Sequence, residues 1–245
     1  MEFEFIILLC IILFFASLVH GSIGFGFPII STPLIALSTD MQTAIIYTLI
    51  PTLLVNIISI KSEGTITEAF KKFWLLALYT SIGSAVGTLL LIYFHSDIFK
   101  LLLALMILFY LALGFIKFEM SWVKQKARLS QSFFGIVSGV LGGLTNAMSP
   151  ILIIYTLESK FSKKEVIQAF NVCFLTGKII QISIFCLSSA FTFKEFSISS
   201  FSIIFVLIAF ILGMKLKKLI NAELYKKIIK VILFIIAMML LWQSV

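Results

Sequence analysis

Apolar stretches of helical length run through the whole sequence and constrain what the chain can fold into. They lie at residues 5–20, 23–39, 42–60, 73–94, 98–116, 131–146, 148–157, 166–189, 197–214 and 228–243. A helix needs about 20 apolar residues to cross the hydrocarbon core of a bilayer. Continuous rather than alternating apolar residues favour such helices over the strands of a barrel. The sequence therefore predicts an all-α polytopic membrane protein.

The composition excludes most other classes of protein. Of the 245 residues, 61% are hydrophobic and 12% are charged, whereas about a quarter of the residues in a soluble domain are charged. This balance excludes a soluble globule, a disordered chain and a nucleic-acid-binding tail. Cys10, Cys173 and Cys186 lie in apolar stretches without the spacing of metal ligands. We therefore expect no disulfide framework, no metal site and no cofactor, and the acidic start of the chain predicts no secretory signal.

Basic residues concentrate in alternate connections, which predicts the orientation of the chain. Four linkers hold sixteen of the 19 basic residues, namely Lys61, Lys71 and Lys72; Lys117, Lys124, Lys126 and Arg128; Lys160, Lys163 and Lys164; and Lys215, Lys217, Lys218, Lys226, Lys227 and Lys230. The other connections hold Lys100 and Lys194. By the positive-inside rule the four linkers face the cytoplasm. Both termini are then outside, and the net charge of +8 indicates loop orientation rather than a nucleic-acid partner.

This orientation predicts an inverted repeat. The interrupted stretch 5–39 would enter and return on the outer side, and the interrupted stretch 131–157 on the cytoplasmic side. Each half is then a broken or re-entrant helical hairpin followed by three transmembrane helices, with about eight to ten helical segments in all. The predicted halves are residues 1–120 and 129–245, joined by a cytoplasmic linker at 121–128. Such architecture is typical of secondary transporters.

Short sequence similarities accompany the predicted repeat. Gly21-x-x-Gly24 matches Gly139-x-x-Gly142 at a separation of 118 residues. At a separation of 125 residues, Asp40, Ala44 and Asn56 match Glu165, Ala169 and Gln181.

The interruptions themselves are candidate anion sites. The first contains Gly21, Gly24, Gly26, Pro28 and Pro33, and the second contains Gly142, Gly143, Asn146 and Pro150. Glycine permits turns and close approach, and proline removes amide donors from a helix. Two half-helix N-termini meeting inside the membrane would expose amides to an anion. The alternative is that the glycines pack helices against one another, and Gly135, Gly139 and Gly143 have the spacing for it.

Lys178 is the one basic residue deep inside an apolar stretch. Burying a lysine at mid-membrane is costly, which predicts a polar interior and a role as counter-charge to a substrate anion. Asn171 and Gln181 lie near the same helix face, and Asn56 has a related place in the other half. The alternative is that Lys178 binds carbonyls freed by a broken helix. For His20 we expect a hydrogen-bonded histidine rather than a carrier of a coupling proton.

The interrupted stretches also resemble a known family. The segments His-Gly-Ser-Ile-Gly-Phe-Gly-Phe-Pro-Ile-Ile-Ser-Thr-Pro-Leu (20–34) and Gly-Gly-Leu-Thr-Asn-Ala-Met-Ser-Pro-Ile-Leu-Ile-Ile-Tyr (142–155) resemble the two motifs of the TauE/SafE membrane permeases. The resemblance implies transport of sulfite, sulfonates or other sulfur-containing organic acids across the bacterial cytoplasmic membrane. The second motif departs from the pattern, because Asn146 and Ser149 stand where glycines are usual.

These observations predict a secondary transporter for a small anion that works by alternating access, not an enzyme. An anion channel or a non-transporting assembly partner remains the alternative. No nucleotide-binding loop appears, and an intramembrane enzyme would need paired catalytic groups that the spans lack. The expected partners are the anion, lipid and a coupling ion, with a proton and sodium both left open. The sequence leaves the oligomeric state open too.

Overall fold

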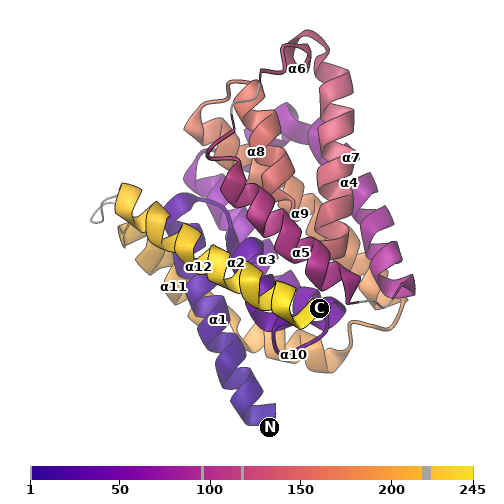
Figure 1. Ribbon diagram of the computed structural model, residues 1–245, viewed down its shortest axis with the longest axis vertical. Helices are drawn as coiled ribbons and strands as arrows, with labels where there is room; N and C mark the ends of the chain where they lie inside the picture. Colours follow the sequence, from indigo (N-terminus) through magenta and orange to yellow (C-terminus); the bar gives the residue numbers. More distant parts are fainter. Residues whose placement is uncertain (1, 95–96, 117–118, 217–221, 245) are drawn as a thin grey trace.

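The protein is a bundle of helices in the computed structural model, which describes residues 2–94, 97–116, 119–216 and 222–244 (Figure 1). Within these ranges the helices are α1 (Glu2–Ile23), α2 (Phe27–Ala36), α3 (Met41–Ser62), α4 (Ile66–Tyr93), α5 (Ile98–Ala112), α6 (Trp122–Gln125), α7 (Ala127–Thr145), α8 (Ser149–Glu158), α9 (Lys163–Leu187), α10 (Phe193–Phe201), α11 (Ile203–Leu216) and α12 (Ala222–Ser244). Lys117, Lys217 and Lys218 of the predicted cytoplasmic linkers lie outside the described residues.

The predicted all-helical membrane fold is confirmed. Five stretches of the described residues are long and apolar enough to cross a membrane: Phe3–Ile23, Met41–Ser62, Ile66–Tyr93, Lys163–Leu187 and Phe193–Leu216. Apolar side chains also cover outward-facing surfaces of the bundle, including Ile82 and Val86 on α4 and Ile208 and Ile211 on α11. Exposed apolar surface of this extent is suited to contact with lipid.

Some elements differ from the sequence expectation. The first helix runs through Gly21 to Ile23, so α1 is long enough to span alone. In contrast, the span expected at 98–116 contains only the 15 residues of α5. The described residues also hold more helices than expected, because the predicted linker forms the short helix α6 and Ser202 separates α10 from α11.

Two short breaks interrupt the bundle where glycine, asparagine and proline gather. The first lies between α1 and α2, where Gly24 and Gly26 have positive φ angles of 99° and 105°. Glycine adopts this conformation without the steric cost of a Cβ. The second lies between α7 and α8, where Asn146 has a φ of 64°, a conformation that asparagine tolerates better than most residues.

Several structural features of the chain recur at one separation in sequence. Gly24 and Asn146, at the two breaks, are 122 residues apart, and so are Pro28 and Pro150, which lie in the first turns of α2 and α8. The same 122 residues separate Asp40 from Ser162, the N-caps of α3 and α9. This separation differs from the 118 and 125 residues at which the short sequence motifs match. At a separation of 122 residues, Asn56 aligns with Lys178 rather than with Gln181. Gln181 then aligns with Ser59.

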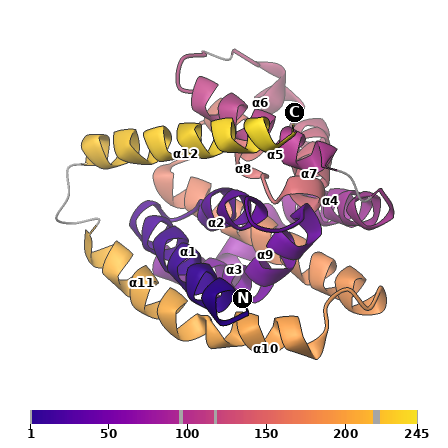
Figure 2. The same ribbon diagram turned by 60° about the horizontal axis from the view of Figure 1, so that its bottom comes forward.

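Several contacts between a helix of the first part of the chain and one of the second have a counterpart in which the corresponding helices have changed places. Helix α4 packs on α7, and α1 packs on α11; likewise α4 packs on α9, and α3 packs on α10. Helices α5 and α8 are in contact, as are α12 and α2. The equivalent helices α3 and α9 pack on each other near the centre of the bundle (Figure 2). The breaks therefore flank a central α3–α9 pair.

Glycines allow the closest helix crossings. A Cβ on Gly139 of α7 would lie 2.2 Å from the Thr80 carbonyl oxygen of α4, and one on Gly143 would lie 2.6 Å from the Ser84 oxygen. At the α1–α11 crossing, a Cβ on Gly21 would lie 2.3 Å from the Phe210 carbonyl oxygen. Gly21 and Gly143 thus have the helix-packing role that the sequence left open as the alternative.

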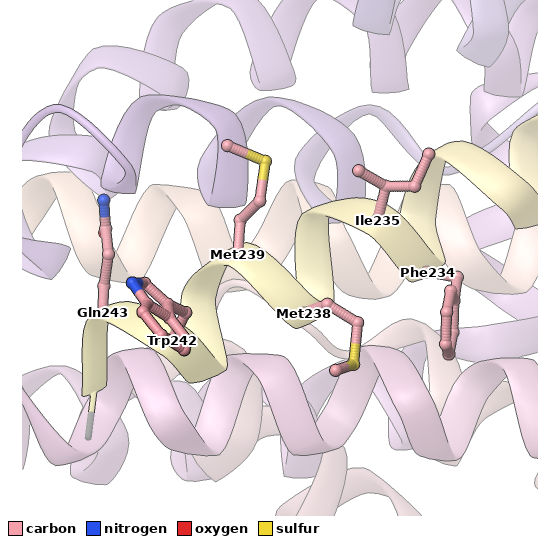
Figure 3. A pocket seen from close by; sticks show the side chains of 6 residues that line it. All are labelled: Phe234, Ile235, Met238, Met239, Trp242 and Gln243. Carbon is pink, nitrogen blue, oxygen red and sulfur yellow. The ribbon is translucent and has the colours of Figure 1, made fainter.

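An apolar groove lies on the outer surface of α12 (Figure 3). Its lining comes entirely from this helix, from Phe234, Ile235, Met238, Met239, Trp242 and Gln243. The apolar side chains among these are about half exposed or more. Such a surface is suited to lipid tails rather than to a small anion.

We expect Gly139→Ala to destabilise the protein, because its methyl group would force α4 and α7 apart at a backbone contact. Overpacking of this kind costs about 1–3 kcal/mol. The matched control is Gly114→Ala, whose methyl group would meet the flexible end of Lys230 at 3.0 Å. Melting temperatures of the purified variants in detergent test the prediction. Equal melting of the two variants would show that the α4–α7 crossing can relax.

Candidate functional site

Lys178 lies on α9 with its side chain fully buried. Its Nζ donates hydrogen bonds to Asn146 Oδ1 and Gln181 Oε1. Both acceptors are neutral amides, and within the described residues no carboxylate is a partner of this ammonium group. In its protonated form this group carries three donors, so one N–H then remains beyond the two that these amides accept.

The orientation of the Asn146 amide is set by the first half of the chain. The Thr48 hydroxyl donates its proton to the Ile45 carbonyl at 2.6 Å. Thr48 Oγ1 therefore accepts from Asn146 Nδ2, at 2.9 Å, and Thr32 Oγ1 accepts from the same amide nitrogen at 2.7 Å. With its NH₂ group engaged on α2 and α3, Asn146 turns its oxygen toward Lys178.

Gln181 is oriented by the second break. Its Nε2 donates to the Gly143 carbonyl at 3.3 Å, one of the carbonyls at the end of α7 that lack a partner within the helix. The amide oxygen is thereby left to face Lys178. Both acceptors of the lysine are thus held in place by backbone or hydroxyl groups rather than by charge.

His20 lies in the last turn of α1, beside the first break, and is almost completely buried. Its Nδ1 accepts from the backbone N–H of Phe27, the first residue of α2, at 3.3 Å. The proton of the neutral ring is then on Nε2, which donates to Ser59 Oγ at 2.9 Å. These contacts agree with the expectation of a hydrogen-bonded histidine.

Asn171 connects α9 to the same break. Its Nδ2 donates to the carbonyl oxygens of Gly24 and Ile167, both at 2.7 Å. Helix α9 therefore binds the first break through Asn171 and the second through Lys178 and Gln181. The seven residues from Asn171 to Lys178 span about 10 Å of helix.

Several buried polar atoms have no partner in the described structure. They include both amide atoms of Asn56, Oδ1 of Asn171 and the hydroxyl of Ser149, and also Gln42 Oε1 and Thr88 Oγ1. In the common register Asn56 corresponds to Lys178, whose partner Asn146 corresponds to Gly24. Because glycine has no side chain, Asn56 lacks the partner that Lys178 has. A buried polar group without a partner costs about 1–3 kcal/mol, which favours a ligand at this place.

A column of polar side chains on α3 connects the two breaks. Thr48 contacts Asn146 at the second break, and Ser59 contacts His20 at the first. Thr52 and Asn56, both buried, lie between them at helical spacing. From Thr48 to Ser59 the column is about 16 Å long. Together with Asn171 and Lys178 of α9, it forms one polar region inside the apolar bundle.

The predicted site residues fall into groups. Asn146, Lys178 and Gln181 meet at the second break, and the Gly143 carbonyl joins them. Gly24 and Asn171 meet at the first break. The Cβ position of Gly142 faces the Met148 side chain, and Gly26 is the residue before α2. Pro28 and Pro150 lie in the first turns of the short helices α2 and α8, and Pro33 lies buried within α2.

Thr32, Thr48 and Ser59 are absent from the sequence prediction. The four-residue spacing of Thr48, Thr52 and Asn56 was a signal for a polar helix face. Hydroxyl groups often bond to the carbonyl of their own helix, as Thr48 and Thr52 do here. Their presence in an apolar stretch therefore does not by itself indicate a site.

The region offers one cation together with neutral amide and hydroxyl groups. Lys178, Asn146 and Asn56 are all buried, so this conformation is closed toward both surfaces. The chemistry of these groups suits an anion that accepts hydrogen bonds.

A comparison with protein-family models identifies the family of this chain. The family model described as Sulfite exporter TauE/SafE matches residues 9–240, which include both breaks and the polar region. Comparisons of the chain with curated proteins and with solved structures give no significant match. Since the match covers nearly the whole chain, the protein belongs to the TauE/SafE family of membrane transporters.

Proposed function

We propose that this protein is a secondary transporter of a small anion, namely sulfite, a sulfonate or another sulfur-containing organic acid. It would act by alternating access in the bacterial cytoplasmic membrane, with the polar region between the breaks as the substrate site. The observation that carries the proposal is the buried Lys178, whose partners among the described residues are neutral amide oxygens.

Electrostatics supports an anionic substrate. A buried charge is costly unless it is paired, and at mid-membrane a lysine costs about 2.5–3.5 kcal/mol on insertion scales. Amide oxygens lower this cost without cancelling the charge. A substrate anion would supply the missing negative charge and accept the remaining N–H. The unpartnered amide of Asn56 would bind the same ligand toward the first break.

The exchanged helix contacts support an inverted repeat of residues 1–120 and 129–245. The basic linker 121–128 contains α6, which lies at the end of the bundle opposite the N-terminus (Figure 1). This placement agrees with a cytoplasmic linker and an outer N-terminus. Alternating access would then exchange the roles of the two halves around the α3–α9 pair.

Lys178→Ala should reduce anion uptake at least tenfold, because the variant removes the counter-charge. Lys178→Arg should also impair uptake, since the larger guanidinium group does not fit a fully buried position shaped around an ammonium group. Proteoliposomes loaded with wild type or variant and given sulfite, thiosulfate, sulfoacetate and simple carboxylates provide the measurement. The control is Lys71→Ala, at an exposed position on α4. Normal uptake by Lys178→Ala would show that Lys178 is not part of the substrate site.

Asn146→Asp should block uptake while preserving the fold. The new carboxylate would lie against Lys178 and supply from within the protein the charge that the substrate otherwise brings. Thermal-shift measurements should show a protein that is at least as stable as wild type but no longer stabilised by sulfite. Asn146→Ala removes the same hydrogen bonds without adding charge and is the matched comparison. Unchanged sulfite stabilisation in Asn146→Asp would argue against charge pairing at Lys178.

The inverted topology can be tested by cysteine labelling in a background that lacks the native cysteines. An impermeant maleimide applied outside should label Lys194→Cys but neither Lys124→Cys nor Lys163→Cys, until the membrane is opened. The reason is that both of the latter positions lie in basic linkers on either side of the second hairpin. Labelling of 124 and 163 from opposite sides would exclude the inverted arrangement.

A further inference from the structure

We propose, against the expectation from the sequence, that His20 binds a proton together with the substrate anion, so that the protein carries both. This inference rests on the proposed function and adds the coupling ion to it. It starts from the position of His20 at the first break, where the ring contacts α2 and α3 and the adjacent Gly24 contacts α9.

The neutral ring is part of the closed first break. Nδ1 accepts the Phe27 N–H, one of the amides at the start of a helix that have no partner within it. Nε2 donates to Ser59. The ring thus closes the N-terminus of α2 and fixes that terminus to α3.

Protonation is incompatible with one of these two contacts. An imidazolium ring donates from both nitrogens and has no acceptor. Nε2 can still donate to Ser59, but Nδ1 can no longer accept from Phe27. The Phe27 amide and the Nδ1–H then both point their hydrogens into the first break. A closed neutral break becomes a cationic one with two new donors.

The surroundings of His20 do not compensate that charge. The groups that face the ring are Ser59 of α3, Phe27 of α2, Asn171 of α9 and Phe210 of α11. None of these four side chains is titratable or charged, and Lys178 lies two helical turns beyond Asn171 along α9. Because no described residue that faces the ring carries a negative charge, the compensating charge has to come from the ligand.

An anion between the breaks would meet this requirement. It would bind Lys178 at the second break, and its negative charge would offset that of a protonated His20 at the first. Binding of the proton and of the anion then favour each other, and such coupling is reciprocal. The empty site would hold one cation and the loaded site two, with the anion between them.

Isothermal calorimetry on the purified full-length protein in detergent tests the inference without a transport assay. Methanesulfonate and sulfoacetate are the probes, because neither changes its ionisation near pH 7.5. Titrations in two buffers of different ionisation enthalpy give the number of protons taken up with each anion. We expect about one proton for wild type, and an affinity that falls up to tenfold per pH unit above the range in which histidine titrates.

His20→Asn is the informative variant. Its Oδ1 can accept from Phe27 in place of Nδ1, but the side chain does not titrate. We expect this variant to bind the anion without proton uptake and with an affinity independent of pH. His20→Gln places its amide near Ser59 and serves as a second variant should the first fail to fold. The control is His95→Asn, at the second histidine of the chain, which should take up protons as wild type does.

The outcomes separate the two proposals. Absence of binding and of uptake for every anion in the panel would overturn the proposed function, and this inference with it. Anion binding by wild type without proton uptake would overturn only the role of His20. Proton uptake that persists in both His20 variants would do the same, because it would place the proton elsewhere.

Discussion

The hydrogen bonds between Lys178, Asn146 and Gln181 hold the centre of the structure together. The lysine is on α9, Asn146 ends α7, and Thr32 and Thr48 orient Asn146 from the first half. One buried cation thereby connects both halves and the second break. Because its partners are neutral, these contacts fix the position of the charge without cancelling it, and an anion can still be bound.

Irregular backbone inside a membrane is stable only where its polar groups find partners within the protein. At the first break the Gly24 carbonyl accepts from Asn171 of the other half. At the second, Gln181 donates to the Gly143 carbonyl. Breaking and forming such contacts requires α9 to move relative to the hairpins. The groups that stabilise the breaks are therefore the same groups that would respond to a ligand.

The apolar stretches predicted the helical membrane fold, and the clustering of glycine and proline predicted both breaks to within a few residues. The repeat register was harder to predict because glycines serve two purposes here. Gly21 and Gly139 both lie at helix crossings, but they are not equivalent positions. The helix N-caps Asp40 and Ser162 instead give the separation of 122 residues. The burial of Lys178 beside Gln181 could be predicted from hydropathy and helical spacing. The contribution of Thr32 and Thr48 depends on tertiary contacts that no local pattern encodes.

The common register also shows how the two halves differ in chemistry. Lys178 corresponds to Asn56, and the glycine at 142 corresponds to His20. Two lysines at the equivalent positions would place two permanent cations in one buried region, and the empty site would then be strongly destabilised. In the actual sequence the second half provides one lysine, and the first half provides an unpartnered amide and a titratable ring. A second positive charge then forms only when His20 takes up a proton. For this reason, binding of the anion and binding of the proton depend on each other.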